Sequence, residues 1–152
     1  MEKIVSLDLT ELIHNSLHMQ NVDVKSYSPL VLAYIGDCIY ELVIRQLVMN
    51  KGNRAVQILH AESSHLVQAS TQSLMMREMQ EHLTVNEHAI YRRGRNAKSV
   101  TAAKNQSITD YRRATGFEAL MGYLYLNHEH KRMLELIEIG LNSLDETLDD
   151  KH

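Results

Sequence analysis

Residues that interrupt helices are scarce in this chain. It has one proline and six glycines among 152 residues, which favours helices over many short strands. A single cysteine, Cys38, excludes an internal disulfide, and no apolar run is long enough to span a bilayer. The N-terminus has no basic segment followed by an apolar one, so we expect no export signal, no membrane partner and a cytoplasmic location.

The bulk composition is that of a folded domain. Hydrophobic residues make up 44% of the chain and charged residues 23%, which excludes disordered and collagen-like classes. The length suits one domain with its own hydrophobic core. We therefore expect residues 1–152 to form a single domain, with residues 145–152 as a frayed acidic tail.

Apolar residues recur at helical spacing along the chain, which predicts an all-α fold. Ser28 and Pro29 mark a helix start, because serine caps well and proline suits the first helical position. Asn53 is a candidate cap for a later helix, and Thr84 to Glu87 fit a capping box. The expected helices cover, approximately, residues 8–18, 30–49, 54–82 with an internal break, 85–94, 107–127 and 129–144.

Two acidic residues stand inside segments that are apolar on nearly every face. Asp37 lies within residues 30–44, and Glu118 lies within residues 114–126. A buried carboxylate is costly unless a cation, a metal or a cavity accommodates it. Gly36, beside Asp37, costs about 1 kcal/mol relative to alanine inside a helix, which is tolerable where another backbone must approach closely.

The two segments could therefore cross with their acids facing each other. Such a site collects negative charge, which a divalent cation relieves, and an all-oxygen ligand set favours Mg²⁺ or Mn²⁺ over zinc. Glu41 lies one turn after Asp37 on the same helix face. The alternative is that structural salt bridges satisfy the acids, with Arg45, Arg112 and Arg113 as available partners.

Basic residues are concentrated between positions 92 and 113, although the net charge is −3. Asp110 is the single acidic residue in this stretch of the sequence, which holds Arg92, Arg93, Arg95, Lys98, Lys104, Arg112 and Arg113. A local basic segment can bind a polyanion even when the whole chain is acidic. The alternative is a solvated charged loop.

The histidines and the cysteine could in principle bind a metal, but the sequence favours surface or packing roles for them. The pairs His60–His65 and His128–His130 do not have the spacing of a zinc cage, so we assign them to the surface or to helix packing. Cys38 follows Asp37 in an apolar setting, which predicts a small buried residue.

The residues around both acids are similar to two motifs of one family. The segment from Leu32 to Leu42 resembles the signature helix of ribonuclease III, and the segment from Phe117 to Leu126 resembles that family's second metal-binding helix. The chain length and residues 93–98, Arg-Gly-Arg-Asn-Ala-Lys, are most similar to the Mini-ribonuclease III branch, which consists of the catalytic domain alone.

This resemblance implies a homodimeric helical bundle that cleaves double-stranded RNA with Mg²⁺ and leaves 5′-phosphate and 3′-hydroxyl ends. It implies the large-subunit ribosomal RNA precursor as substrate, and Asp37 and Glu118 as catalytic metal ligands, with Glu41 adding charge or organising the groups around them. Ala33 and Thr115 stand where larger enzymes carry acids, which leaves the number of metals open. A catalytically silent RNA-binding dimer and an unrelated helical bundle are the alternatives.

The basic segment would then take over part of the work of a separate RNA-binding domain. Double-stranded RNA is recognised mostly by shape, through phosphates and 2′-hydroxyls. We expect RNA contacts from Arg92, Arg93, Arg95, Asn96, Lys98, Lys104 and Asn105.

Overall fold

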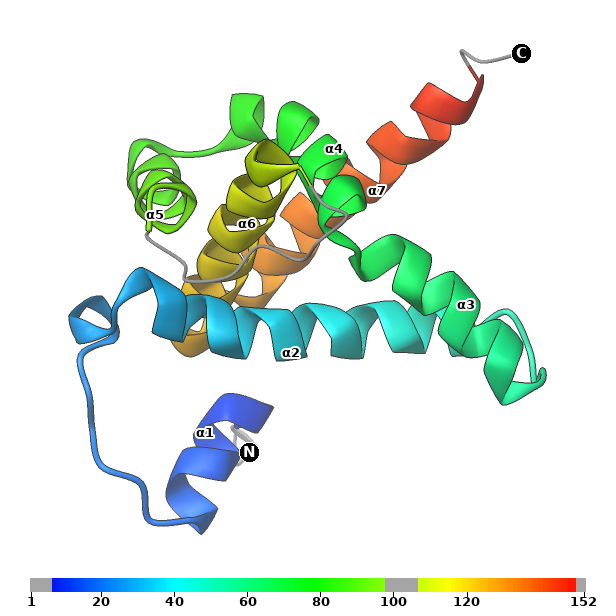
Figure 1. The fold of residues 1–152 in the computed structure, drawn as a ribbon. Helices are drawn as coiled ribbons and strands as arrows, with labels where there is room; N and C mark the ends of the chain where they lie inside the picture. The colour runs from blue at the N-terminus through cyan, green and yellow to red at the C-terminus, as the bar shows by residue number, and fades with distance from the viewer. Residues whose placement is uncertain (1–6, 98–106, 150–152) are drawn as a thin grey trace, which may run out of the picture.

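The computed structural model describes residues 7–97 and 107–149, and every regular element within these ranges is helical (Figure 1). The all-α prediction is therefore confirmed. None of the helices described combines the length and apolar character needed to cross a lipid bilayer. In chain order the elements are α1 (Leu9–Ser16), η1 (Val24–Ser26), α2 (Pro29–Met49), α3 (Val56–Val67), α4 (Ala69–Met79), η2 (Gln80–His82), α5 (Val85–Arg95), α6 (Ile108–Leu126) and α7 (His130–Asp149).

The predicted capping signals set three helix boundaries. The Ser28 side chain accepts a hydrogen bond from the Val31 backbone N–H, so α2 begins at Pro29 as expected. Thr84 and Glu87 form the reciprocal capping box at the start of α5. The break expected within residues 54–82 falls at Gln68, whose extended backbone separates α3 from α4.

Two expected boundaries were wrong. Asn53 does not cap α3, which begins at Val56 after Ala55 with no side-chain cap, because Arg54 instead holds this turn through hydrogen bonds to Glu62. Helix α7 continues to Asp149, so residues 145–149 of the expected frayed tail are helical. Neither glycine nor proline interrupts the sequence after Gly140.

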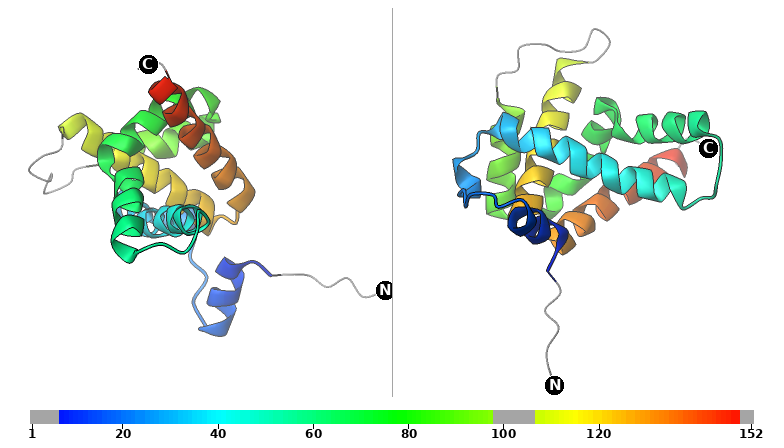
Figure 2. Two further views of the ribbon diagram at one scale, coloured as in Figure 1. Left: turned by 90° about the vertical axis from the view of Figure 1, so that its right-hand side faces the viewer. Right: turned by 90° about the horizontal axis from the view of Figure 1, so that it is seen from below.

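Helix α6 forms the centre of the bundle, packed against α2, α4, α5 and α7 (Figures 1 and 2). Its Phe117, Leu120 and Leu124 side chains are fully buried. Met75, Met76 and Met79 of α4 are also fully buried, because these flexible side chains fill the core between α4 and α6. The central place of α6 explains how Glu118, in its middle, comes to lie inside the fold.

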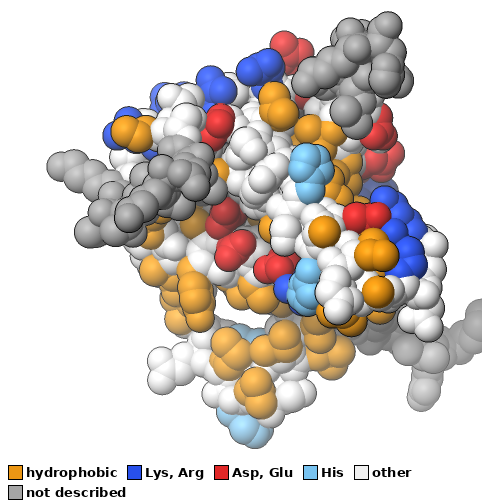
Figure 3. Space-filling model, turned by 45° about the vertical axis from the view of Figure 1, so that its right-hand side comes forward, with side chains coloured by type: hydrophobic (Ala, Val, Ile, Leu, Met, Phe, Trp, Pro, Cys, Tyr) orange, Lys and Arg blue, Asp and Glu red, His pale blue; other side chains and the backbone are white. Residues whose placement is uncertain are grey.

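Helix α2 is buried on one side and exposed on the other. Along its exposed side lie Val31, Tyr34, Cys38 and Leu42, with Tyr34 81% exposed. The expectation that Cys38 is buried was therefore wrong for the single chain, because the bundle covers only the opposite face of α2. Apolar side chains gather on the lower half of the face in Figure 3, the level at which α1 and α2 run.

Candidate active site at the crossing of two helices

Helices α2 and α6 approach each other at two glycines. A Cβ atom on Gly36 would lie 1.7 Å from the backbone oxygen of Glu118, and one on Gly122 would lie 2.0 Å from the backbone oxygen of Leu32. No side chain fits at such distances without moving a backbone. The close approach that the sequence predicted at Gly36 is thus present, and it brings the acidic turns of both helices together.

Asp37 and Glu118 line the same cavity, which has a volume of about 390 Å³. Asp37 comes from α2 and Glu118 from α6, and the break between α3 and α4 supplies a third wall. The other lining residues are Leu30, Ala33, Tyr34, Val67, Gln68, Ala69, Tyr111, Ala114 and Thr115. The cavity has room for an ion together with water or a phosphate group, since a water takes up about 30 Å³ of liquid volume.

Both acids are held in surroundings that disfavour their charged forms. Burial, followed by the negative charge of Asp37, raises the pKa of Glu118 to about 8. Asp37 is exposed in the single chain, so the burial expected from the sequence was wrong for this acid. Partial loss of hydration nevertheless raises the pKa of Asp37, with a further contribution from the charge of Glu41. In the absence of a bound cation, Glu118 therefore holds a proton at neutral pH.

Two of the arginines that could have satisfied these acids are engaged elsewhere. Arg45 pairs with Glu41 at 2.8 Å, and Arg113 donates to the Ser73 hydroxyl at 3.5 Å. Within the described ranges, neither Asp37 nor Glu118 forms an ion pair with a lysine or arginine. The structural salt bridges considered from the sequence are absent from this part of the chain.

Glu41 is partly buried and belongs to the surroundings of the cavity. Its carboxylate accepts two hydrogen bonds from Arg45 and does not line the cavity. Its charge acts on Asp37 from the next turn of α2. This geometry favours an electrostatic role for Glu41 over direct contact with a bound ion.

Gln72 of α4 is a neighbour of Glu118 that the sequence analysis missed. Its side chain is 1% exposed, and its Nε2 donates to the Val67 backbone oxygen at 3.0 Å. Hydrogen bonding from Gln72 opposes the rise in the pKa of Glu118, and the Gln72 Oε1 atom has no partner among the described groups. The signal was available, because Gln72 lies on the same helix face as the buried Met75, Met76 and Met79.

Two small side chains line the cavity where more acids would fit. Ala33 is buried and Thr115 is half-buried, each one turn before an acid on its own helix. The Thr115 hydroxyl donates to the Tyr111 backbone oxygen at 3.0 Å, so its hydrogen is directed away from the carboxylates. Asp37 and Glu118 therefore supply the carboxylates of the cavity.

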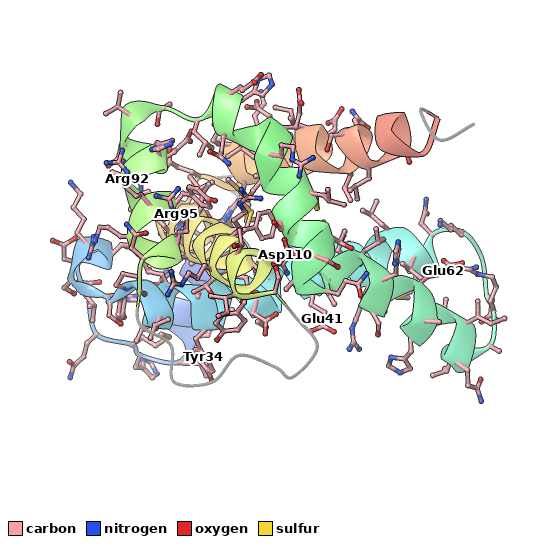
Figure 4. All side chains as sticks on the ribbon, turned by 45° about the horizontal axis from the view of Figure 1, so that its top comes forward. Tyr34, Glu41, Glu62, Arg92, Arg95 and Asp110 are labelled. Atoms are coloured by element: carbon pink, nitrogen blue, oxygen red, sulfur yellow. The ribbon has the colours of Figure 1, made fainter. Side chains whose placement is uncertain are left out.

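The basic residues expected to contact RNA lie at the end of α5. Arg92 and Arg93 are exposed in the last turn, and Asn96 caps the helix. Arg95 is half-buried, with its guanidinium 5.7 Å from the centre of the Tyr91 ring. Figure 4 shows Arg92 and Arg95 on α5, at the opposite end of α2 from Glu62. Lys98, Lys104 and Asn105 lie outside the described residues.

Comparisons with known proteins agree on one family. A family model described as the ribonuclease III domain matches residues 30–129. A protein named Mini-ribonuclease 3 from Clostridium tetani is 46% identical over 126 residues, which cover 82% of this chain and 83% of that protein. A Mini-ribonuclease 3 from Enterococcus faecalis is also 46% identical, with 82% of this chain and 96% of that protein covered.

A solved structure has the same fold. The crystal structure of a protein from Fusobacterium nucleatum superposes with a TM-score of 0.72 at 29% sequence identity. The match covers 78% of this chain and 97% of that one. The matched family segment contains both acids of the cavity.

Proposed function

The chain belongs to the ribonuclease III family, and we propose that it is an endoribonuclease that cleaves double-stranded RNA at the cavity between α2 and α6. The observation that carries this proposal is the pair of carboxylates, Asp37 and Glu118, that share one cavity without a compensating cation among the described residues. The family match supports the reaction class, and the acid pair supports this cavity as the site of the reaction.

The side chains of the cavity fit a divalent metal ion. Asp37 and Glu118 would hold it, and their oxygen atoms are the ligands that Mg²⁺ prefers, with Mn²⁺ as a substitute. The raised pKa of Glu118 fits the same interpretation, because a bound cation would offset the burial and the negative charge of Asp37 that favour the proton. When bound, Mg²⁺ supplies the positive charge that activates water and stabilises the leaving oxygen of a phosphodiester.

The protein residues orient the reactants. The crossing at Gly36 and Gly122 fixes the backbones that carry both acids. Their carboxylates can accept hydrogen bonds from water and would thereby position the water that attacks the phosphate. Attack by this water, with the 3′ oxygen as the leaving group, gives 5′-phosphate and 3′-hydroxyl ends.

We place the RNA contacts at the end of α5. Arg92 and Arg93 are exposed and can reach phosphates, and Asn96 can donate to a phosphate or a 2′-hydroxyl. Replacing Arg92 and Arg93 by alanine should weaken duplex binding and reduce its salt dependence by about two released ions. Arg77, exposed on α4, provides a matched control. An unchanged salt dependence in the double variant would contradict this assignment.

The exposed side of α2 supports a homodimer. Val31, Tyr34, Cys38 and Leu42 recur at the spacing of one helix face, and a second copy packed there would bury them. Tyr34 also lines the cavity, so this seam would lie beside both active sites. A duplex held along the dimer would then meet two cavities, which suits cleavage of both strands. The family resemblance suggests the large-subunit ribosomal RNA precursor as substrate.

The test is cleavage of a labelled RNA duplex, including a ribosomal precursor stem, in the presence of Mg²⁺. Wild type should cleave, whereas Asp37→Asn and Glu118→Gln should fold, bind RNA and lose cleavage by a factor of at least about 1000. Binding by wild type without cleavage of any duplex would instead favour a silent RNA-binding dimer, consistent with Ala33 and Thr115 in place of acids.

A further inference from the structure

A second cluster of metal-ligating side chains lies where α1 meets the turn between α6 and α7. The His128 Nδ1 atom lies 3.0 Å from Asp8 Oδ2, and the His130 Nε2 atom lies 3.2 Å from the same oxygen. Glu11 Oε1 lies 3.8 Å from His128 Nδ1. One ligand atom from each of Asp8, His128 and His130 falls within 4.8 Å of the others.

These distances are close to those of a tetrahedral zinc site. Zinc bonds of about 2.0–2.1 Å place neighbouring ligand atoms roughly 3.3–3.4 Å apart. The two distances from Asp8 to the histidines differ from this value by a few tenths of an ångström. Imidazole nitrogens with carboxylate oxygens form a donor set typical of zinc, unlike the all-oxygen cavity between α2 and α6.

His128 occupies a backbone position that a histidine does not favour. Its φ is +57°, in the left-handed region, directly after the last residues of α6. Glycine and asparagine are the usual residues at such helix ends. The Glu129 N–H donates to the Leu124 oxygen and closes the helix end by backbone contacts alone. The turn therefore does not need the imidazole of His128, and the role of this side chain follows from its contacts with Asp8 and Glu11.

The cluster also joins α1 to the bundle. In two of the views α1 stands apart from the other helices (Figures 1 and 2). Asp8 and Glu11 contact His128, and the Thr10 hydroxyl lies 3.2 Å from His130 Nε2. Zinc was not expected here because the spacing of His128 and His130 in the sequence does not match a zinc cage. These two residues supply two possible ligands. The third comes from Asp8, 120 residues earlier than His128.

We propose that Asp8, His128 and His130, with Glu11 as the fourth ligand, bind one Zn²⁺ ion that fastens α1 to the α6–α7 turn. This site is separate from the cavity at the helix crossing. Its role is to attach the N-terminal helix, so it does not depend on the nuclease assignment.

The test is calorimetric titration of the full chain with ZnCl₂. The parent protein should carry Asp37→Asn and Glu118→Gln, so that the cavity between α2 and α6 does not contribute. We expect one Zn²⁺ per chain. In His128→Asn the affinity for Zn²⁺ should fall by roughly 100-fold. Removing a residue that only orients a metal ligand already weakens binding by about 10–100-fold, and His128 is a ligand itself. Asparagine suits the left-handed backbone, so this variant should keep the fold.

Two further measurements separate this site from chance binding. His60→Asn removes an exposed histidine outside the cluster and should leave the affinity unchanged. Co²⁺ should give the visible absorption of a tetrahedral site in the parent and lose it in His130→Gln. Absence of stoichiometric Zn²⁺ binding in the parent, or equal affinity in His128→Asn, would overturn the proposal and leave these side chains as a hydrogen-bonded tether alone.

Discussion

Glu87 and Glu118 are both glutamates within helices of one bundle, and their surroundings are opposite. Glu87 is 4% exposed and accepts two hydrogen bonds from Arg132, each 2.9 Å long, and one from the Thr84 backbone N–H. Burial raises its pKa, but these donors outweigh burial and leave the pKa below its usual range. For Glu118, burial and the negative charge of Asp37 both raise the pKa, which reaches about 8.

The difference separates a structural acid from a functional one. Arg132 also donates to the His82 backbone oxygen at 2.7 Å, so the Glu87 pair joins the start of α5 to α7 and is complete within the chain. The Glu118 carboxylate faces a cavity and lacks such a partner. A buried acid that the fold leaves uncompensated is a candidate for binding a cation from outside.

The largest effect is expected when Glu118 is given a positively charged side chain to pair with, as Glu87 already has in Arg132. Thr115→Lys places an ammonium group at the cavity wall, where it should pair with Asp37 or Glu118 and compete with Mg²⁺. We expect duplex cleavage to fall about 1000-fold. Thr109→Lys adds the same charge at an exposed position of α6 and serves as the control. Cleavage by Thr115→Lys at the rate of this control would show that the cavity acids are not required.

Removing Arg132, the positively charged partner of Glu87, tests whether Glu87 is a structural acid. Arg132→Met leaves a buried carboxylate unpaired, which should lower the free energy of unfolding by about 3 kcal/mol in urea denaturation at pH 7. The control is Arg45→Met, because Arg45 and Glu41 form an exposed pair one turn apart on α2, and it should cost less than about 0.5 kcal/mol. Equal losses in the two variants would mean that the Glu87 pair has no special structural role.

Local patterns in the sequence predicted the helices and the two acids. The serine–proline start of α2, the capping box of α5 and the glycine beside Asp37 depend on residues within a few positions, so they can be recognised in the sequence directly. The glycine at the crossing was informative because its cost in a helix required a reason. That reason is the backbone of Glu118.

Contacts between distant segments were not predictable in the same way. Gln72 reaches Glu118, and Asp8 reaches His128, only after separate helices have packed. The end of α7 was misjudged because acidic residues at a helix C-terminus are unfavourable, while the absence of glycine and proline allowed the helix to continue. The exposed side of α2 was expected to be buried because sequence patterns do not tell whether the covering partner is the same chain or a second copy.

The pH dependence of the free energy of unfolding should also distinguish Glu118 from Glu87. Since the folded pKa of Glu118, about 8, exceeds the ordinary value of 4.5, the folded protein holds a proton that the unfolded chain has lost between these pH values. Stability therefore falls as pH rises through this window. Glu118→Gln removes this contribution to the pH dependence. The full shift would correspond to about 4 kcal/mol at pH 8, and partial exposure of the carboxylate reduces the expected gain in stability over wild type without metal to about 2 kcal/mol. Urea denaturation at pH 5 and pH 8 measures it, and identical pH dependence in the two proteins would contradict the raised pKa.

Thr115→Asp enlarges the uncompensated charge and should change stability in opposite directions with and without metal. A third carboxylate at the cavity repels Asp37 and Glu118, so the metal-free variant should unfold at a lower temperature than wild type at pH 8. The same carboxylate offers Mg²⁺ another oxygen ligand and should tighten binding about tenfold, or roughly 1.4 kcal/mol. Thermal unfolding across a Mg²⁺ titration measures both effects, with Thr109→Asp as the exposed control. If Thr115→Asp were less stable than wild type at every Mg²⁺ concentration, the cavity would not bind Mg²⁺ through its acids. Glu118 and Glu87 would then differ only in their burial.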